Sequence, residues 1–291
     1  MKFYKLQASG NDFILIDRLT GAGHLDNFYK NFALKYCCRK LGIGADGLLV
    51  IEPSKIAPFK MRIFNSDGSE AQMCGNGARC AAYWASIKFN TKKTERICFE
   101  TKAGIIEPQI LGANPKGKKI KNWEQIRVKM TDPFNLELDF PINVFGKNIK
   151  VNFINSGVPH AVVFVQGLEN IDVKNIGRAV RFHERFSPAG ANVNFAEFKE
   201  DNFIKIRTYE RGVEAETLAC GTGAVASAVI SWLKIHDSIL EAKKTVELKV
   251  ETKGREVLKV KFDIEEENIN NVWLEGKAYL VYEGKIEGGA C

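Results

Sequence analysis

The chain has 291 residues, of which 45% are hydrophobic and 26% charged, and its formal net charge is +7. These values exclude a low-complexity chain and are typical of a soluble protein with room for two domains. No apolar run is long enough to span a bilayer and no targeting segment precedes the folded pattern, so we expect a cytoplasmic protein with no membrane partner. The basic residues are dispersed, and their densest cluster, at 116–121, lacks interleaved aromatic residues, so we expect no nucleic-acid partner.

The seven cysteines give no sign of a disulfide framework or a metal site. Their number is odd, no CxxC pair occurs, and no histidine stands at ligand spacing from Cys74 or Cys80. We therefore expect no metal. Cys291 is expected to be exposed at the chain end. Four others are interpreted as small buried hydrophobic residues, namely Cys37, Cys38, Cys80 and Cys98.

In chain order, the first half begins with a short apolar strand over 13–17. An amphipathic helix follows, for which Asp26 is a plausible N-cap, and then an alternating strand over 61–65. The segment Cys74-Gly75-Asn76-Gly77-Ala78 opens an apolar helix, and hairpin-like strands over 97–110 close this half.

The second half repeats this order. A strand over 161–165 precedes a helix with Asp172 as its expected N-cap, and a strand over 203–210 follows. The segment Cys220-Gly221-Thr222-Gly223-Ala224 opens a second apolar helix, and strands over 245–264 close the half. Each half therefore has the same rhythm of strands and helices.

Matched residues at nearly constant spacing indicate an internal duplication. The two CGxGA segments lie 146 residues apart. Three further matches follow in the same order, with spacings of 146 or 147: Gly44-Ala45 with Gly190-Ala191, Asp26 with Asp172, and Ser9-Gly10 with Ser156-Gly157. Several matches in one order are hard to explain by chance.

We predict an α+β fold of two pseudo-symmetric domains, each a curved β-sheet or barrel around a central buried helix. The helices after the two cysteines are apolar nearly all round, which is typical of burial on most sides. The N-terminal domain is placed at 1–120 and the C-terminal domain at 121–275, joined near 112–124. A last strand pattern over 277–286 is expected to return and complete the first domain, at about 276–291.

Each CGxGA segment combines a potential base with a potential anion site. Unpaired first-turn amides and the helix dipole lower the pKa of a cysteine at a helix start, so thiolate becomes accessible near neutral pH. Because the glycines have no side chains, the first turn of the helix stays accessible, and a carboxylate could approach its unpaired backbone amides. One such segment alone could equally be a tightly packed helix start with a buried cysteine, but a second matched copy favours chemistry.

Two such cysteines on opposite faces of one carbon could invert its configuration. One would remove the proton and the other would return a proton to the opposite face. The sulfurs would then lie roughly 7 Å apart with the substrate between them. No motif indicates a P-loop, a Schiff-base lysine or pyridoxal phosphate, so no cofactor is expected.

With these residues in view, the chain resembles the diaminopimelate epimerase family over essentially its full length. The resemblance implies two β-rich domains, each around a central helix, and conversion of LL- to meso-diaminopimelate by two thiols without cofactor or metal. It places the reaction in lysine and peptidoglycan biosynthesis, and we expect a homodimer. The matching stretches are ASGNDFILID at 8–17, GIGADGLL at 42–49, RIFNSDGSEAQMCGNGARC at 62–80, GVPHAV at 157–162, ANVNF at 191–195 and YERGVEAETLACGTGA at 209–224.

The resemblance also assigns roles to individual residues. Cys74 and Cys220 would be the catalytic pair, with Glu210 and His160 as the polar pair beside the reacting centre. The reacting carboxylate would bind at the helix starts, through Gly75, Asn76, Gly221 and Thr222. The distal amino and carboxylate groups would bind Asn11, Asn65, Asn192 and Arg211. Taken singly, the asparagines are more typical of turns, His160 of a core and Glu210-Arg211 of a surface ion pair.

Two departures and three alternatives accompany this interpretation. Many family members have Asn where this chain has Val158, and some have Gln where it has Gly47. Proline racemases and hydroxyproline epimerases share the two-cysteine fold but typically have His at the position of Asn76. An isomerase of the phenazine-pathway type is disfavoured because both cysteines are present. The remaining alternative is a non-catalytic protein that binds a zwitterionic amino acid.

Overall fold

The computed structural model describes residues 1–20, 26–90, 96–111, 123–236, 244–265 and 268–287. The chain forms two compact units, each treated by itself below. Unit 1 comprises Met1–Val128 and Gly276–Cys291, and unit 2 comprises Lys129–Glu275. The basic cluster at 116–121, most of the predicted linker and Cys291 lie outside the described residues. No helix in the described ranges is long and apolar enough to cross a membrane.

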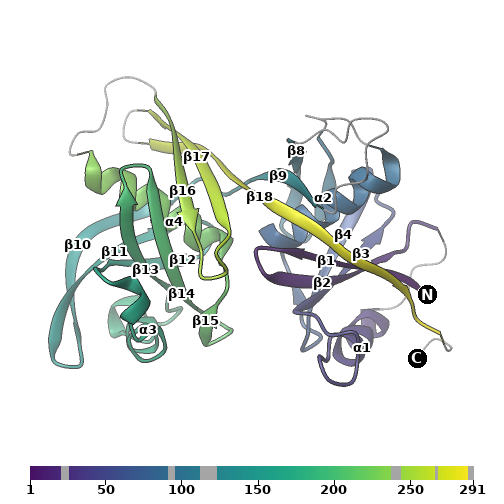
Figure 1. Cartoon of the computed structure of the whole chain (residues 1–291), viewed down its shortest axis with the longest axis horizontal. Coiled ribbons are helices and arrows are strands. Elements are labelled where there is room, and N and C mark those ends of the chain that lie inside the picture. The colour runs from purple at the N-terminus through teal and green to yellow at the C-terminus, as the bar shows by residue number, and fades with distance from the viewer. Residues whose placement is uncertain (21–25, 91–95, 112–122, 237–243, 266–267, 288–291) are drawn as a thin grey trace. The chain divides into compact units, whose positions relative to one another are not determined.

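In its described residues, unit 1 combines two helices with short strands (Figure 1). The helices are α1 (Asp26–Tyr36) and α2 (Gly75–Phe89). The strands, in chain order, are β1 (Lys2–Ala8), β2 (Asn11–Asp17), β3 (Gly47–Glu52), β4 (Phe59–Asn65), β5 (Glu70–Ala71), β6 (Phe99–Thr101), β7 (Gly104–Ile106), β8 (Gln109–Ile110) and β9 (Trp123–Lys129), whose last residue belongs to unit 2.

The described part of unit 2 likewise combines α-helices with strands, and it adds two 3₁₀ turns. Its α-helices are α3 (Val173–Arg181) and α4 (Gly221–Ile235), and two 3₁₀ turns, η1 (Leu168–Asn170) and η2 (Glu184–Phe186), flank α3. Its strands are β10 (Phe134–Val144), β11 (Lys147–Asn155), β12 (Pro159–Phe164), β13 (Asn192–Glu200), β14 (Phe203–Glu210), β15 (Ala215–Thr217), β16 (Lys244–Glu251) and β17 (Val257–Glu265).

Strand pairing confirms that the units repeat one topology. In unit 1, β2 and β3 are parallel, β4 runs antiparallel to β3, and β6 lies parallel to β4. In unit 2, β12 and β13 are parallel, β14 runs antiparallel to β13, and β16 lies parallel to β14. The matched glycines Gly44 and Gly190 both adopt left-handed φ values, +80° and +64°, in the turns before β3 and β13. The duplication read from the sequence is therefore also a duplication of backbone conformation.

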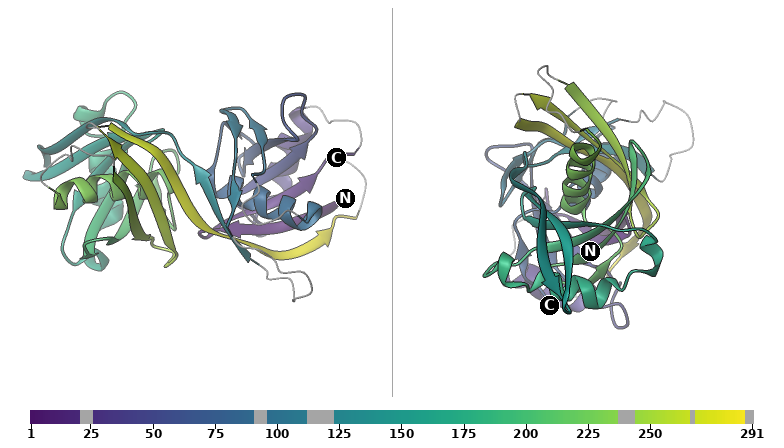
Figure 2. Two further views of the ribbon diagram at one scale, coloured as in Figure 1. Left: turned by 90° about the horizontal axis from the view of Figure 1, so that it is seen from above. Right: turned by 90° about the vertical axis from the view of Figure 1, so that its left-hand side faces the viewer.

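A buried helix lies at the centre of each unit, which confirms the predicted fold class. The strands of unit 2 enclose α4 in the right-hand view of Figure 2. Small residues line the helices, such as Ala81 and Ala82 in α2 and Ala226 and Ala228 in α4, so the strands can approach closely. Each larger apolar side chain buried there stabilises the fold by roughly 1.5–3 kcal/mol.

The last strand, β18 (Asn268–Lys285), contributes to both units. Its early residues pair with β17, and its later residues pair antiparallel with β1. The capping aspartate of unit 2 is also confirmed, because Asp172 accepts a hydrogen bond from the Asn175 amide at 3.1 Å. Asp26 differs: it is the first residue of α1, and its carboxylate pairs with Arg62 at 2.8 Å.

The cysteines predicted as buried hydrophobic residues fall into two groups. Cys37 and Cys80 are buried, and burial raises the pKa of the Cys37 thiol to about 12. Cys38 and Cys98 are only half-buried, so the prediction of burial is wrong for them. In both places the adjacent residues occupy the buried positions, Cys37 next to Cys38 and Ile97 and Phe99 on either side of Cys98.

Candidate active site

Both cysteines singled out in the sequence stand at the start of a buried helix. Cys74 is the N-cap of α2 and Cys220 the N-cap of α4. Each has an extended backbone, with φ and ψ of −145° and 119° at Cys74 and −121° and 115° at Cys220. The next residues turn directly into the helix, so the free first-turn amides begin immediately after each sulfur-bearing residue.

Glycine stands at different positions of the two CGxGA segments for different structural reasons. A side chain at Gly75 would meet no atom within 4 Å, so the space beside the first amide of α2 is open. A Cβ at Gly223 would lie 2.4 Å from Oδ1 of Asn194, which no side chain could tolerate without a shift. Gly75 therefore leaves room for a ligand, whereas Gly223 leaves room for a neighbouring residue of the protein.

The first half-site is built around Cys74. Its sulfur accepts a hydrogen bond from the Gly77 amide at 3.4 Å. Asn76 is buried, and its Oδ1 accepts a hydrogen bond from Nη2 of Arg79 at 2.7 Å. The same Arg79 nitrogen donates to Ser9 Oγ at 2.7 Å, which ties the β1–β2 turn to the start of α2. Arg79 is wholly buried and was not singled out in the sequence, although a charged residue within an otherwise apolar helix was a usable signal.

Asn11 and Asn65 share one edge of the unit 1 sheet. Asn11 begins β2 and Asn65 ends β4, with the start of β3 at Gly47 between these strands. Asn65 is exposed and its amide donates to Ser69 Oγ at 3.0 Å. Asn11 Oδ1 is buried without a hydrogen-bond partner among the described residues. An acceptor of this kind suits the ammonium group of a ligand.

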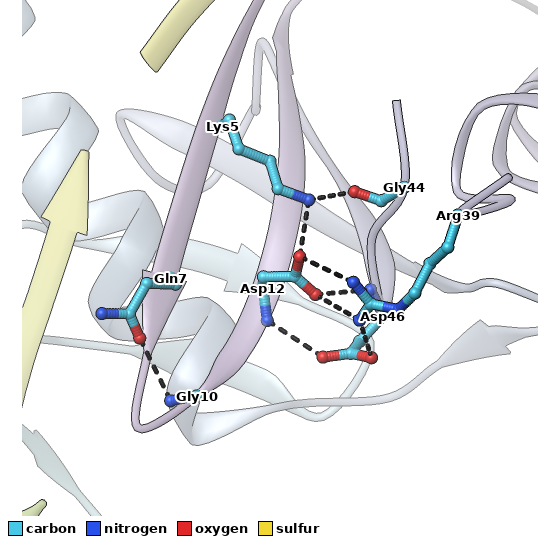
Figure 3. A network of polar contacts seen from close by, with 7 residues as sticks. All are labelled: Lys5, Gln7, Gly10, Asp12, Arg39, Gly44 and Asp46. Atoms are coloured by element: carbon cyan, nitrogen blue, oxygen red, sulfur yellow. Dashed lines mark hydrogen bonds and ion pairs between the residues drawn. The ribbon is translucent and has the colours of Figure 1, made fainter. Parts of the chain in front are cut away.

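A polar network holds this edge in place (Figure 3). Asp12 pairs with Lys5 at 2.6 Å and with Arg39 at 2.8 Å, and Arg39 also pairs with Asp46 at 2.7 Å. The backbone amides of Asp12 and Asp46 donate to each other's carboxylates at 3.1 and 3.0 Å. Burial alone would raise the pKa of Asp12, but hydrogen bonds from Arg39 and Lys5 hold it well below its usual range. The network thus locks the start of β2, and Asn11 with it, against the turn before Gly47.

The second half-site is built around Cys220. Its sulfur lies 3.4 Å from the Thr222 hydroxyl, and that hydroxyl lies 2.9 Å from Nε2 of His160. His160 is wholly buried on β12, and its Nδ1 lies 3.0 Å from the Asn194 amide nitrogen. Burial, reinforced by the charge of Arg211, lowers the pKa of His160 to about 3, so the ring is neutral at physiological pH.

Asn192, Glu210 and Arg211 occupy one edge of the unit 2 sheet. Asn192 begins β13 and Glu210 ends β14, and Arg211 follows directly. The Asn192 amide oxygen accepts from the Arg211 backbone amide at 2.8 Å, and its nitrogen donates to the Pro159 carbonyl at 3.3 Å. Burial raises the pKa of the Glu210 carboxyl. Asn192 therefore fixes the turn that carries Arg211.

In both units the structure places the sequence-predicted residues at the start of the central helix and at the adjacent strand edge. Three polar residues that sequence reasoning missed lie beside them: Arg79, Asn194 and Thr208, whose hydroxyl lies 2.9 Å from Asn194 Oδ1. Of the two departures, Val158 is half-buried just before β12, and Gly47 starts β3 so close to β4 that a Cβ there would lie 2.8 Å from the Phe64 carbonyl oxygen.

The fold and site define a class of two-unit proteins with one helix-start half-site in each unit. A solved phenazine biosynthesis protein of the PhzF family from Bacillus anthracis is 18% identical, covers 99% of both chains and has a TM-score of 0.74. A probable proline racemase from Agrobacterium radiobacter K84 is 14% identical, covers 98% of this chain and 92% of its own, and has a TM-score of 0.68. At these identities the likeness shows the fold alone.

Sequence comparison places the chain within that class. The family described as diaminopimelate epimerase matches residues 3–132 and again 152–281, once in each half. The diaminopimelate epimerase of Aquifex aeolicus (strain VF5) is 43% identical over 98% of this chain and 98% of its own length. The chain belongs to the diaminopimelate epimerase family.

Proposed function

We propose that this chain is a diaminopimelate epimerase that interconverts LL- and meso-diaminopimelate, with Cys74 and Cys220 as its acid and base. The observation that carries the proposal is that each unit presents one cysteine at the start of a buried helix. Family membership supplies the substrate, and the two helix starts supply the chemistry. The reaction belongs to lysine and peptidoglycan biosynthesis.

In the proposed reaction, one thiolate removes the proton from the α-carbon as the other thiol delivers its own proton to the opposite face. The first sulfur ends as a thiol and the second as a thiolate, so charge and protons balance and the carbon is inverted. Negative charge that develops on the substrate spreads into its α-carboxylate. The helix-start amides at Gly75-Asn76 and Gly221-Thr222 would stabilise that charge. All of these groups belong to the chain, and the step calls for no cofactor.

The strand edges beside the helix starts would bind the rest of the substrate. Asn11 offers a buried acceptor for the distal ammonium group, and Asn65 an exposed amide beside it. Arg211, held by Asn192, would pair with the distal carboxylate. Glu210 and His160 would adjust the polarity next to the reacting carbon. These roles account for polar residues at sheet edges that packing does not require.

The domain boundaries and the cellular setting are further parts of the proposal. We place one epimerase domain at 1–120, completed by about 276–291, and its duplicate at 121–275. The family resemblance supports a homodimer in the cytoplasm with diaminopimelate as its small-molecule partner. Size-exclusion chromatography with light scattering tests the dimer.

Turnover of LL-diaminopimelate against L-proline tests the function. We expect meso-diaminopimelate to form from LL-diaminopimelate without added metal or pyridoxal phosphate, and L-proline to remain unchanged. The comparison matters because proline racemases share the fold, while Asn76 stands where they typically have His. Efficient racemisation of L-proline, or binding of diaminopimelate without turnover, would reject the proposal in favour of one of those classes.

A further inference from the structure

Three structurally equivalent positions lie next to the starts of α2 and α4, and their side chains are apolar in unit 1 but polar in unit 2. Strand register defines these positions. Phe13 on β2 pairs with Gly47 on β3 in unit 1, and His160 on β12 pairs with Asn192 on β13 in unit 2, so Phe13 and His160 are equivalent. The next two positions follow from the pairings of Leu49 with Ile63 and of Asn194 with Thr208. Unit 1 fills the three positions with apolar residues, Phe13, Leu49 and Ile63, whereas unit 2 fills them with His160, Asn194 and Thr208.

All six residues are buried, at 3% exposure or less. Unit 1 shows that apolar side chains pack these positions well, because its three residues lie in the hydrophobic core around α2. Burying polar groups instead is unfavourable unless each finds a hydrogen-bond partner. The polar residues of unit 2 therefore have a role other than packing.

The three polar residues form a continuous chain of hydrogen bonds that ends at Cys220. The Thr208 hydroxyl lies 2.9 Å from Asn194 Oδ1, and Asn194 Nδ2 lies 3.0 Å from His160 Nδ1. From His160 Nε2 the chain continues to the Thr222 hydroxyl at 2.9 Å and to the Cys220 sulfur at 3.4 Å. Gly223 fits this arrangement, since any side chain there would collide with the Asn194 amide.

One backbone carbonyl fixes the direction of every bond in the chain. Asn194 Nδ2 lies 3.3 Å from the Ala161 carbonyl oxygen, which can only accept, so this amide end donates. His160 Nδ1 must then accept, and a neutral ring carries its proton on Nε2. That N–H donates to Thr222 Oγ1, and the only proton of the Thr222 hydroxyl is left to point at the sulfur.

We infer that Asn194 and Thr208 are positioning residues that hold His160 in its Nε2–H tautomer and thereby make Thr222 a hydrogen-bond donor to the Cys220 sulfur. A donor favours the thiolate over the thiol. Among the described residues, the charged groups facing this site are Glu210, which ends β14, and Arg211, which follows it; burial, reinforced by the charge of Arg211, keeps the His160 ring neutral. The role of this hydrogen-bond chain in catalysis rests on the proposed function.

The tautomer can be measured directly in the unmodified protein. Long-range proton–nitrogen correlation spectra of the imidazole separate a protonated from an unprotonated ring nitrogen, and His160→Gln assigns the signal among the four histidines. We expect His160 to carry its proton on Nε2 throughout pH 5–9. An Nδ1–H tautomer, or a charged ring in that range, would overturn the inference.

Alkylation rates of the individual cysteines test the consequence at the sulfur. Asn194→Leu copies the residue at the equivalent position of unit 1. We expect it to slow iodoacetamide labelling of Cys220 at pH 7 about tenfold, the effect of removing a hydrogen bond to a charged group. Cys74 should label at its normal rate. Thr208→Val should give a smaller slowing, because Ala161 still orients the amide, and Ile63→Val, its matched control, should give none.

Unchanged Cys220 labelling in Asn194→Leu, or equal slowing of Cys74 and Cys220, would overturn the inference. If Asn194→Leu fails to fold, the tautomer of the wild-type protein and the Thr208→Val rate still decide it. Neither readout requires turnover. If the protein epimerised no substrate, the proposed function would be rejected but the hydrogen-bond chain from Thr208 to Cys220 would remain supported. If His160 had the wrong tautomer, only the inference about this hydrogen-bond chain would be rejected.

Discussion

The starts of α2 and α4 have the same backbone but different surroundings. Cys74 accepts a backbone hydrogen bond from Gly77, and the buried Arg79 anchors Asn76 beside it. Cys220 lies at the end of a chain of side-chain hydrogen bonds through Thr222 and His160. Duplication has therefore kept the position of the thiol while the groups that determine its protonation have diverged. Two thiols with unequal surroundings suit a reaction in which one must be a base while the other is an acid.

The largest expected effect comes from removing either thiol. Cys74→Ala and Cys220→Ala should each lower the epimerisation rate by at least about 10³-fold, because inversion needs both an acid and a base. Chiral chromatography of the product measures the rate, and circular dichroism checks the fold. Cys38→Ala, in a half-buried loop cysteine, is the control and should retain near-normal turnover. Substantial epimerisation by either active-site variant contradicts the assignment.

Arg79 distinguishes the first helix start from the second. Arg79→Met leaves Asn76 and Ser9 without their buried donor, and we expect the free energy of unfolding to fall by about 3 kcal/mol. Urea denaturation measures the loss. Labelling of Cys220 should not change, since its own unit retains every contact. A loss below about 1 kcal/mol would show that Arg79 does not organise this helix start.

His160 should make stability depend on mild acid. Its pKa is lowered to about 3 in the folded protein, against about 6.5 when unfolded, so only the unfolded state gains a proton as pH falls between these values. Between pH 7 and pH 5 the wild type should therefore lose about 2 kcal/mol more than His160→Gln. Asp12 in unit 1 should behave differently. The pKa of its carboxylate is lowered in the folded protein, so its contribution to stability is lost only below about pH 4, and Asp12→Asn should match the wild type in its loss of stability between pH 7 and pH 5. Parallel curves for wild type and His160→Gln from pH 7 to pH 5 would refute this account.

Substitutions to alanine separate the two kinds of glycine, and Gly75→Ala is expected to have the smallest effect on stability. Gly75→Ala enters open space and should change the free energy of unfolding by less than about 0.5 kcal/mol. It should nevertheless raise KM, because the methyl group occupies the proposed carboxylate site. Gly223→Ala meets Asn194 and should destabilise the fold by roughly 1–3 kcal/mol. Thermal unfolding and steady-state kinetics measure both, and an unchanged KM in Gly75→Ala would argue against carboxylate binding there.

Much of this structure follows from local sequence pattern. The alternation in Phe203–Glu210 gave the bounds of β14, and the CGxGA segments gave the starts of both central helices. Asn194 and Thr208 could not be identified in this way. They meet His160 only through the pairing of β12 with β13 and of β13 with β14, which joins residues 34 and 14 positions apart in the chain. Alternation places Thr208 on the buried face of β14, and β13 is buried on both faces around Asn194, but neither pattern shows which partner satisfies a buried amide.

The most direct test of the two-thiol account is the timing of deuterium uptake in D₂O. A thiol carries a single proton, so the proton taken from LL-diaminopimelate stays on one sulfur while the other delivers solvent deuterium. At early times the account predicts that newly formed meso-diaminopimelate carries deuterium at the inverted carbon, while the remaining LL-diaminopimelate carries none. Protium retained in the product, or deuterium appearing equally fast in unreacted substrate, would indicate a single base and contradict the central claim.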